Sequence, residues 1–267
     1  MELSGKVVAQ KIQEDLIAKV ENLKSRGITP SLAVLLVGND PASLVYVKAK
    51  ETMAEKLGVD FRLYHFSGKC RAAQVLELID ELNNDPKVHG IIVQLPLPVG
   101  FDTEKIIKAI DPSKDVDGLS GEMSAPTAEA ILALLEHYRI NLEGDIVIVG
   151  RGRLVGQPLE KILKKRGLAP KVLDSTSANL EEETLKADIL VSATGVPGLI
   201  KADMISKKTI VIDAGTAESK GEVKGDVVKE VYQKVKAYSP VPGGVGPLTV
   251  VMLMNNLVEA AKEGENG

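Results

Sequence analysis

The stretch Ile146-Val-Ile-Val-Gly150-Arg-Gly-Arg-Leu-Val-Gly156-Gln-Pro158 decides how the second half of this chain folds. Its four β-branched residues are typical of a short buried strand, and the glycine-rich turn after them leads into an expected helix over 155–166. Backbone amides at the start of such a helix can bind a pyrophosphate. The glycines at 150, 152 and 156 stand one residue further apart than in the usual dinucleotide fingerprint. The loop by itself is therefore equally typical of a tight strand-to-helix turn.

The sequence that follows this turn favours the dinucleotide interpretation. Strands and a helix alternate there as in a parallel sheet, with strands expected at Lys171–Asp174, Asp188–Ala193 and Thr209–Asp213 and a helix at Leu180–Lys186. The first of these strands ends roughly 20 residues beyond the glycines, as it does in dinucleotide-binding units. Thr194 and Gly195 follow a later strand, where they would border the nicotinamide side of the site.

The first half of the chain predicts a second alternating unit. It opens with a helical stripe of apolar residues at Val8, Ile12, Leu16, Val20 and Leu23, which Gly27 and Pro30 end. Strands are then expected at Ser31–Val37, Val59–Phe66 and His89–Leu95, and helices at Ser43–Leu57, Ala72–Asn83 and Thr103–Ile110. Ser43 is the expected N-cap of its helix, and Gly58 the residue that ends it.

A polar, Gly- and Pro-containing stretch, Pro112–Pro126, separates the two halves, and a linking helix is expected at Ala128–His137. We therefore expect a two-domain α/β protein with a cleft between its domains. Residues 1–120, completed by a C-terminal helix within 246–267, would form a three-layer α/β domain. Residues 121–245 would form a Rossmann-type dinucleotide-binding domain.

Composition narrows the possible functions. The 267 residues are 44% hydrophobic and carry a net charge of −4. The sequence has no basic stripe interleaved with aromatic residues, so we expect no nucleic-acid partner. The single cysteine, Cys70, excludes an intrachain disulfide and fits a reducing compartment. The three histidines lack ligand-like spacing, so we expect no metal site. No stretch of 18 apolar residues occurs and the first 20 residues are charged throughout, so we expect a cytoplasmic protein that does not enter membranes.

Three polar residues of the first half are candidates for a site. Tyr46 and Lys50 lie four residues apart on an expected helix and so share a face. Gln94 stands at the end of the apolar strand Gly90-Ile-Ile-Val-Gln-Leu-Pro-Leu-Pro98, and ligands bind at the carboxyl ends of parallel strands. Simpler interpretations exist for each: a solvated lysine beside a half-buried tyrosine, and a core amide with satisfied hydrogen bonds.

Two loops are further candidates. Asp115 and Asp117 lie in Lys114-Asp-Val-Asp-Gly118, which is also an ordinary turn sequence. The segment Pro240-Val-Pro-Gly-Gly-Val-Gly-Pro247 has three prolines and three glycines in eight residues directly before a helix expected at Leu248–Ala261. Such a loop is rigid, and it either lines a ligand or simply leads into the helix.

In this order, these blocks resemble the bifunctional methylenetetrahydrofolate dehydrogenase/methenyltetrahydrofolate cyclohydrolase family, from about Gly5 to Ala261. The blocks that carry the resemblance are Ser43–Lys50, Gly90–Pro98, Lys114–Gly118, Val149–Pro158 and Pro240–Pro247. The resemblance implies oxidation of 5,10-methylenetetrahydrofolate with a nicotinamide cofactor. It also implies hydrolysis of the methenyl product to 10-formyltetrahydrofolate, and a homodimer.

The resemblance also implies a role for individual residues. Lys50 would be the catalytic lysine, Gln94 its hydrogen-bonding partner, Tyr46 an orienting residue and Asp117 a ligand of the pterin edge. Pro242, Gly243 and Gly244 would border the folate. The residues implied at the cofactor are Gly150, Arg151, Gly152, Gly156, Ser175, Thr194 and Gly195.

The cofactor that the resemblance implies is NADP, because Arg151 and Ser175 match positions that contact its 2′-phosphate. Asp174 keeps NAD open, since an acid at the end of the second strand commonly accepts a hydrogen bond from the ribose hydroxyl of NAD. The chain departs from the family at Gly152 (usually Ser), Asp174 (usually His), Thr52 (usually Lys) and Ala217, where an Asn is usual. Two alternatives stay open: another two-domain NAD(P) dehydrogenase, of shikimate or amino-acid type, and a non-catalytic dinucleotide-binding protein.

Overall fold

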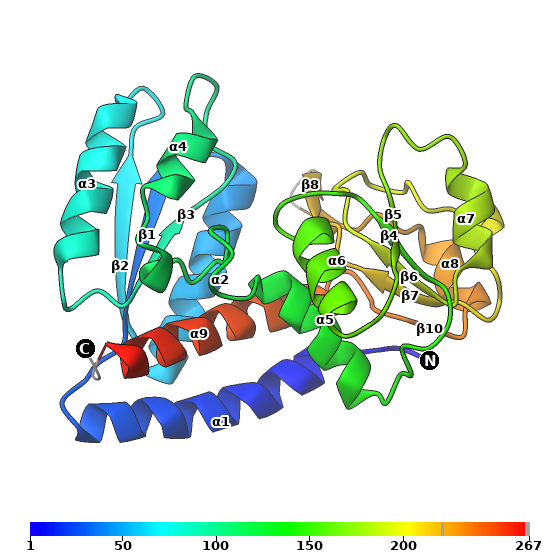
Figure 1. The fold of residues 1–267 in the computed structure, drawn as a ribbon, viewed down its shortest axis with the longest axis horizontal. Coiled ribbons are helices and arrows are strands. Elements are labelled where there is room, and N and C mark those ends of the chain that lie inside the picture. The colour runs from blue at the N-terminus through cyan, green and yellow to red at the C-terminus, as the bar shows by residue number, and fades with distance from the viewer. Residues whose placement is uncertain (220–221, 265–267) are drawn as a thin grey trace. The chain divides into compact units, whose positions relative to one another are not determined.

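The computed structural model describes residues 1–219 and 222–264, and the chain forms two compact units (Figure 1). One unit combines Met1–Gln10 with Thr127–Thr249, and we call it the glycine-turn unit. The other combines Lys11–Pro126 with the chain from Val250 onward, and we call it the lysine unit. The chain passes from one unit into the other within the two terminal helices, α1 (Gly5–Ser25) and α9 (Val245–Glu263), and again between Pro126 and Thr127. The domain limits expected at 120 and 246 stay predictions.

The lysine unit is built on a parallel three-stranded sheet in the order β2 (Asp60–Phe66), β1 (Ser31–Val37), β3 (Gly90–Val93). All seven residues of β1 are buried, as its unbroken apolar sequence predicts for a strand covered on both faces. Alternate residues of β1 pack with α3 (Ala72–Asn84) and α4 (Thr103–Lys108).

The opposite face of this sheet meets α9. A Cβ atom added at Gly90 would lie 2.7 Å from the Leu257 side chain, so the glycine permits the helix to approach closely. The unit therefore has the expected three layers, with helices on both faces of the sheet (Figure 1).

The expectation that Ser43 caps the following helix is wrong. Helix α2 (Pro41–Leu57) begins earlier, because Asp40 is the N-cap and its carboxylate accepts from both the amide and the hydroxyl of Ser43, each at 2.8 Å. Pro41 suits the first helical position because its missing N–H would have no partner there. Gly58 ends the helix at φ 70°, as expected. The strand expected to reach Leu95 ends at Val93, which leaves Gln94 just beyond its carboxyl end.

The glycine-turn unit contains a parallel five-stranded sheet in the order β10 (Ala237–Tyr238), β7 (Ile210–Asp213), β6 (Ile189–Ser192), β4 (Ile146–Val149), β5 (Lys171–Leu173). The order of the strands reverses between β4 and β6, the place where doubly wound sheets bind ligands. Its helices are α5 (Pro126–His137), α6 (Gly156–Lys165), α7 (Leu180–Lys186) and α8 (Lys229–Lys234).

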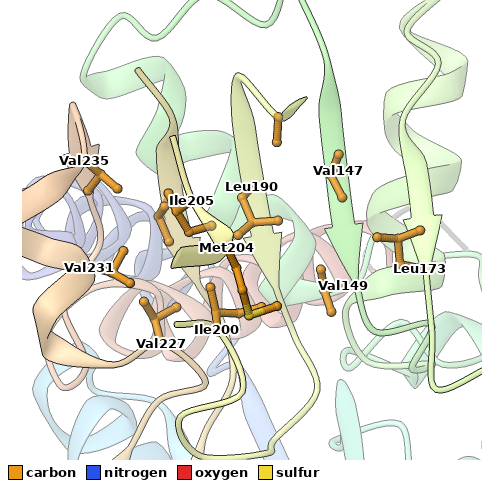
Figure 2. Close-up of a cluster of buried hydrophobic side chains, with 12 residues drawn as sticks. Val147, Val149, Leu173, Leu190, Ile200, Met204, Ile205, Val227, Val231 and Val235 are labelled. Atoms are coloured by element: carbon orange, nitrogen blue, oxygen red, sulfur yellow. The ribbon is translucent and has the colours of Figure 1, made fainter. Parts of the chain in front are cut away.

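Apolar side chains cover both faces of this sheet. Figure 2 shows one of the two clusters, in which Val147 and Leu190 of the sheet meet Met204, Val227 and Val231 from the segments after it. On the other face, residues of α5 and α6 lie around Ile146, Ile189 and Val191. Helices and their connections thus cover both faces of the sheet. The polar candidate residues of this unit follow the carboxyl ends of β4, β5 and β6.

The sequence did not predict the shortest elements. These are the strands β8 (Ala217–Ser219) and β9 (Glu222–Lys224), helix α8, the two-residue strand β10 and two single-turn 3-10 helices, Pro112–Lys114 and Ala202–Met204. Elements of two to six residues carry too little periodicity to be recognised. Helix α9 starts at Val245 rather than Leu248, and Pro247 falls within its first turn, where proline is tolerated.

Candidate functional site

The ammonium group of Lys50 is bound by a second predicted site residue of the lysine unit, Gln94. Lys50 lies in α2, and its Nζ donates a hydrogen bond of 2.8 Å to Gln94 Oε1. The Gln94 amide nitrogen donates to Leu95 O at 2.8 Å, so its oxygen is left to face the lysine. Tyr46 lies one helical turn before Lys50 and is half-buried. The amide of Gln94 is thus held in one orientation by both of its ends.

Lys50 and Asp117 influence each other's charge. Burial lowers the pKa of Lys50, and the nearby Asp117 carboxylate opposes this by raising it. Burial raises the pKa of Asp117; the charge of Lys50 lowers this pKa, and the charge of Asp115 raises it. Both groups are therefore shifted toward their neutral forms, and a neutral lysine becomes accessible closer to neutral pH than for a lysine in water.

The turn that carries Asp117 has its own internal support. Lys114 Nζ donates to three backbone carbonyls at the end of α3, those of Leu82, Asn83 and Asp85, at 3.0, 2.7 and 2.8 Å. The buried Asp115 carboxylate accepts from the amide of Ser120. Gly118 adopts φ 69°, a conformation that favours glycine.

In the glycine-turn unit, two of the three candidate glycines are required by the path of the backbone. Gly150 adopts φ 108°, and a Cβ there would lie 2.4 Å from Ala193 O. A Cβ at Gly156 would lie 1.9 Å from Gly150 O, so the turn folds back tightly on the start of α6. A Cβ at Gly152 would meet open space. Val155, the N-cap residue of α6, provides no side-chain hydrogen bond to the helix.

The candidates Thr194 and Gly195 follow β6, beside this turn, and a residue that the sequence did not single out, Asp226, accepts hydrogen bonds from Thr194. One oxygen of Asp226 accepts from Ser192 Oγ, Thr194 N and Thr194 Oγ1, at 2.7, 2.7 and 2.9 Å. Asp226 is fully buried, and its amide in turn donates to Asp213. Asp226 lies 32 residues after Thr194, so the sequence alone does not predict the contact between them.

Asp213, at the end of β7, is a second buried acid that sequence reasoning did not consider. Burial raises its pKa to about 7, while the amides of Val227, Asp226 and Gly215, which donate to it, lower it. Asp213 therefore ties the chain after β7 to the segment that carries Asp226. A polar residue ending an otherwise apolar strand was the available signal.

Arg151, expected at the 2′-phosphate, lies near Asp174, the residue that precedes Ser175. Arg151 Nε is 3.8 Å from Asp174 Oδ2. The other Asp174 oxygen accepts from Thr176 N and Thr176 Oγ1 at 2.9 and 2.6 Å, and these bonds lower the pKa of Asp174. Ser175 is exposed beside it. The carboxylate of Asp174 is thus already engaged, and Arg151 keeps half of its side chain exposed.

The loop with Pro242, Gly243 and Gly244 is packed against the start of α1. Gly5 N donates to Gly243 O at 3.0 Å, and a Cβ at Gly5 would lie only 1.7 Å from Gly244 O. The Val241–Pro242 peptide is cis, and Gly243 adopts φ 112°. This loop lies in the glycine-turn unit, whereas Lys50, Gln94 and Asp117 lie in the other unit.

The described part of the chain offers neither a metal-binding cluster nor a membrane-spanning helix. Among residues 1–219 and 222–264, no group of three His, Cys, Asp or Glu side chains is placed to hold a metal ion. None of the helices in these same ranges is both long and apolar enough to cross a membrane.

Comparison with known proteins gives a consistent result over the whole chain. Residues 3–117 match the model of the tetrahydrofolate dehydrogenase/cyclohydrolase catalytic domain, and residues 125–265 match the NAD(P)-binding domain of the same enzymes. The bifunctional protein FolD of Lactobacillus helveticus is 42% identical over 97% of each chain.

Two solved structures extend this similarity to three dimensions. The bifunctional FolD enzyme of Campylobacter jejuni has a TM-score of 0.93 and 39% identity, over 98% of this chain and 99% of that one. The methylenetetrahydrofolate dehydrogenase-cyclohydrolase of Trypanosoma brucei, solved with NADP and an inhibitor, has a TM-score of 0.95 and 29% identity, over 100% and 99%. The sequence resemblance and the two-domain α/β fold are confirmed.

Proposed function

The chain belongs to the tetrahydrofolate dehydrogenase/cyclohydrolase family, and we propose that it catalyses both reactions of that name. It oxidises 5,10-methylenetetrahydrofolate with a nicotinamide dinucleotide, and it hydrolyses the methenyl product to 10-formyltetrahydrofolate. The observation that carries this proposal is the cluster of the buried Gln94 with the half-buried Lys50 and Asp117, in a chain that matches both family domains.

The glycine turn fits a dinucleotide. The fold-back at Gly150 and Gly156 leaves no room for side chains, so a pyrophosphate can approach the backbone and the uncapped start of α6. A bound nicotinamide supplies the acceptor for a hydride from the folate carbon. For this step the protein has to hold the two reacting carbons close and aligned, and Asp226 holds the Thr194 turn expected beside the nicotinamide.

The hydrolysis needs proton transfer at Lys50. Water adds to the methenyl carbon, the bond from that carbon to N5 breaks, and water gives up two protons, one to N5 and one to solvent. The lowered pKa of Lys50 makes its neutral amine available to take the first proton from water. Gln94 accepts from the protonated amine and holds it in place through the transfer. Tyr46, one turn away, orients the folate.

We expect Asp117→Ala to weaken folate binding and both activities but to leave dinucleotide binding intact. A carboxylate paired with the amino-pyrimidine edge of the pterin contributes about 1.5–3 kcal/mol as a charge-assisted hydrogen bond. That corresponds to roughly a 10- to 150-fold loss of affinity. Isothermal calorimetry with folate and with the dinucleotide measures both quantities, and unchanged folate affinity rules out the role of Asp117.

We infer that NADP is the preferred cofactor. Arg151 has an exposed guanidinium suited to a 2′-phosphate, and Ser175 adds a hydroxyl donor beside it. Asp174 carries the charge that opposes a phosphate, yet Thr176 and Arg151 already engage it. Removing this charge with Asp174→Ser is expected to raise kcat/KM for NADP⁺ about tenfold relative to NAD⁺. If the wild-type enzyme prefers NAD⁺ and the Ser variant reverses that preference, Asp174 sets the cofactor and NADP is the wrong choice.

Family membership disfavours a shikimate or amino-acid dehydrogenase and a silent dinucleotide sensor. Turnover assays with each substrate class decide among the three, because only the folate enzyme reduces a nicotinamide cofactor with methylenetetrahydrofolate. We also infer that the enzyme is a cytoplasmic homodimer, as the resemblance of its sequence motifs to the family implies; light scattering of the purified protein measures the oligomeric state. The place of Pro242, Gly243 and Gly244 beside the folate stays a prediction.

A further inference from the structure

Asn256, on α9, contacts the turn that carries Asp117 at two places. Its side-chain nitrogen Nδ2 donates to Val116 O and to Ser124 O, both at 2.9 Å. These carbonyls are 140 and 132 residues away in the sequence and stand at the two ends of the segment around Asp117. We propose that Asn256 is a positioning residue for folate recognition, which it serves by holding Asp117 in place; this rests on the proposed function.

The segment between the two carbonyls has little regular structure to hold it. Residues 119–124 form neither helix nor strand, and Gly118 is in the left-handed region. Within the turn, Gly118 N donates to Asp115 O and Ser120 N donates to the Asp115 carboxylate. These bonds fix the shape of the turn, whereas the bonds from Asn256 tie its two ends to a helix.

Helix α9 is a firm support for this contact. Leu257, the residue after Asn256, packs over Gly90 of β3 so closely that a Cβ there would lie 2.7 Å from its Cδ1. Gly90 begins the same strand that Gln94 follows. Through α9, Asn256 therefore connects the Asp117 turn to β3, the strand after which Gln94, the hydrogen-bonding partner of Lys50, lies.

Only a side chain with two N–H donors can make both contacts from one atom. Asn256 Nδ2 uses its two hydrogens on two carbonyls, and a leucine of similar size has none. Because Val116 directly precedes Asp117, a shift of its carbonyl moves the Asp117 backbone. The geometry of the carboxylate toward the pterin then suffers, while the reacting carbon and Lys50 stay where they are.

The test is steady-state kinetics of the full-length Asn256→Leu variant. We expect the KM for methylenetetrahydrofolate to rise about tenfold, with kcat within threefold of wild type and the KM for the dinucleotide unchanged. Asn255→Leu is the matched control, because Asn255 is the preceding residue on α9 and its side-chain oxygen accepts from Lys19 at 3.3 Å rather than contacting the Asp117 turn. This control is expected to leave the folate KM unchanged.

A double variant separates positioning from a general structural role. If Asn256 acts through Asp117, then Asn256→Leu adds less than a twofold change in folate affinity to Asp117→Ala. A structural role alone would give the same fold-change in both backgrounds. Should Asn256→Leu fail to fold, Asn256→Asp keeps the size of the side chain while removing both donors, and the same comparisons apply.

The outcomes are distinct for the two proposals. A wild-type enzyme without activity on methylenetetrahydrofolate overturns the proposed function itself. If the wild type is active, two results overturn the role of Asn256 alone. One is a folded Asn256 variant whose KM for methylenetetrahydrofolate stays within twofold of wild type. The other is an effect of the Asn256 substitution that is undiminished in the Asp117→Ala background.

Discussion

Lys50→Met is expected to lower the rate of methenyltetrahydrofolate hydrolysis by about 10²–10⁴-fold, the range that a positioned general base contributes. Methionine has a similar length and no proton to exchange, so water must be deprotonated without help. The variant is expected to fold, because burial already disfavours the charge that the substitution removes. Hydrolysis of the methenyl substrate, followed by its absorbance, measures the loss, and dinucleotide affinity by calorimetry serves as the check on folding.

Lys48→Met is the matched control for this variant. Lys48 lies on the same helix two residues earlier, is exposed, and pairs with Glu51 at 2.8 Å. Exposed ion pairs contribute little to stability, so this variant is expected to retain the wild-type rate of hydrolysis. If Lys50→Met hydrolyses the substrate at close to the wild-type rate, the assignment of Lys50 as the base is wrong.

Gly156→Ala is expected to weaken dinucleotide binding about 100-fold, which is equivalent to roughly 2.8 kcal/mol. The added Cβ would lie 1.9 Å from Gly150 O and 3.2 Å from Arg151 Cα, both backbone atoms that cannot move aside singly. The turn must therefore open at the position where the pyrophosphate approaches the start of α6. Calorimetric titration with NADP⁺ measures the effect, and a thermal melt shows whether the fold survives.

Gly246→Ala makes the same chemical change without the collision. Gly246 lies in the first turn of α9, and an added Cβ there meets nothing within 4 Å. Alanine is also the better helix former, so this variant is expected to bind the dinucleotide as the wild type does. Wild-type affinity in Gly156→Ala would instead show that the cofactor does not bind at this turn.

The elements that the sequence predicts well are those whose signal is local. Strand β1 appears with both expected ends because seven consecutive buried residues can only lie between two covering layers. Gly58 ends α2 where expected, because the left-handed conformation favours glycine. The start of the same helix differs from the prediction, since Asp40 and Ser43 are both good N-caps and the choice depends on Pro41 between them.

The site residues divide in the same way. Lys50 and Tyr46 stand out by their helical spacing, and Gln94 stands out as an amide after an apolar strand. Asn256 and Asp226 act on turns 132–140 and 32 residues away, so no local pattern connects them to the residues they hold. Their contacts arise only when the sheets and helices have packed, which is why the structure is needed to find them.

The most direct test of the central claim is a stoichiometric progress curve of the wild-type enzyme with methylenetetrahydrofolate and NADP⁺. We predict that reduced nicotinamide appears and that 10-formyltetrahydrofolate forms in equal final amount, because one chain performs the oxidation and the hydrolysis. Either of two results would contradict the claim: no reduction of the nicotinamide, or reduction of the nicotinamide with a methenyl product that is hydrolysed no faster than it is without enzyme.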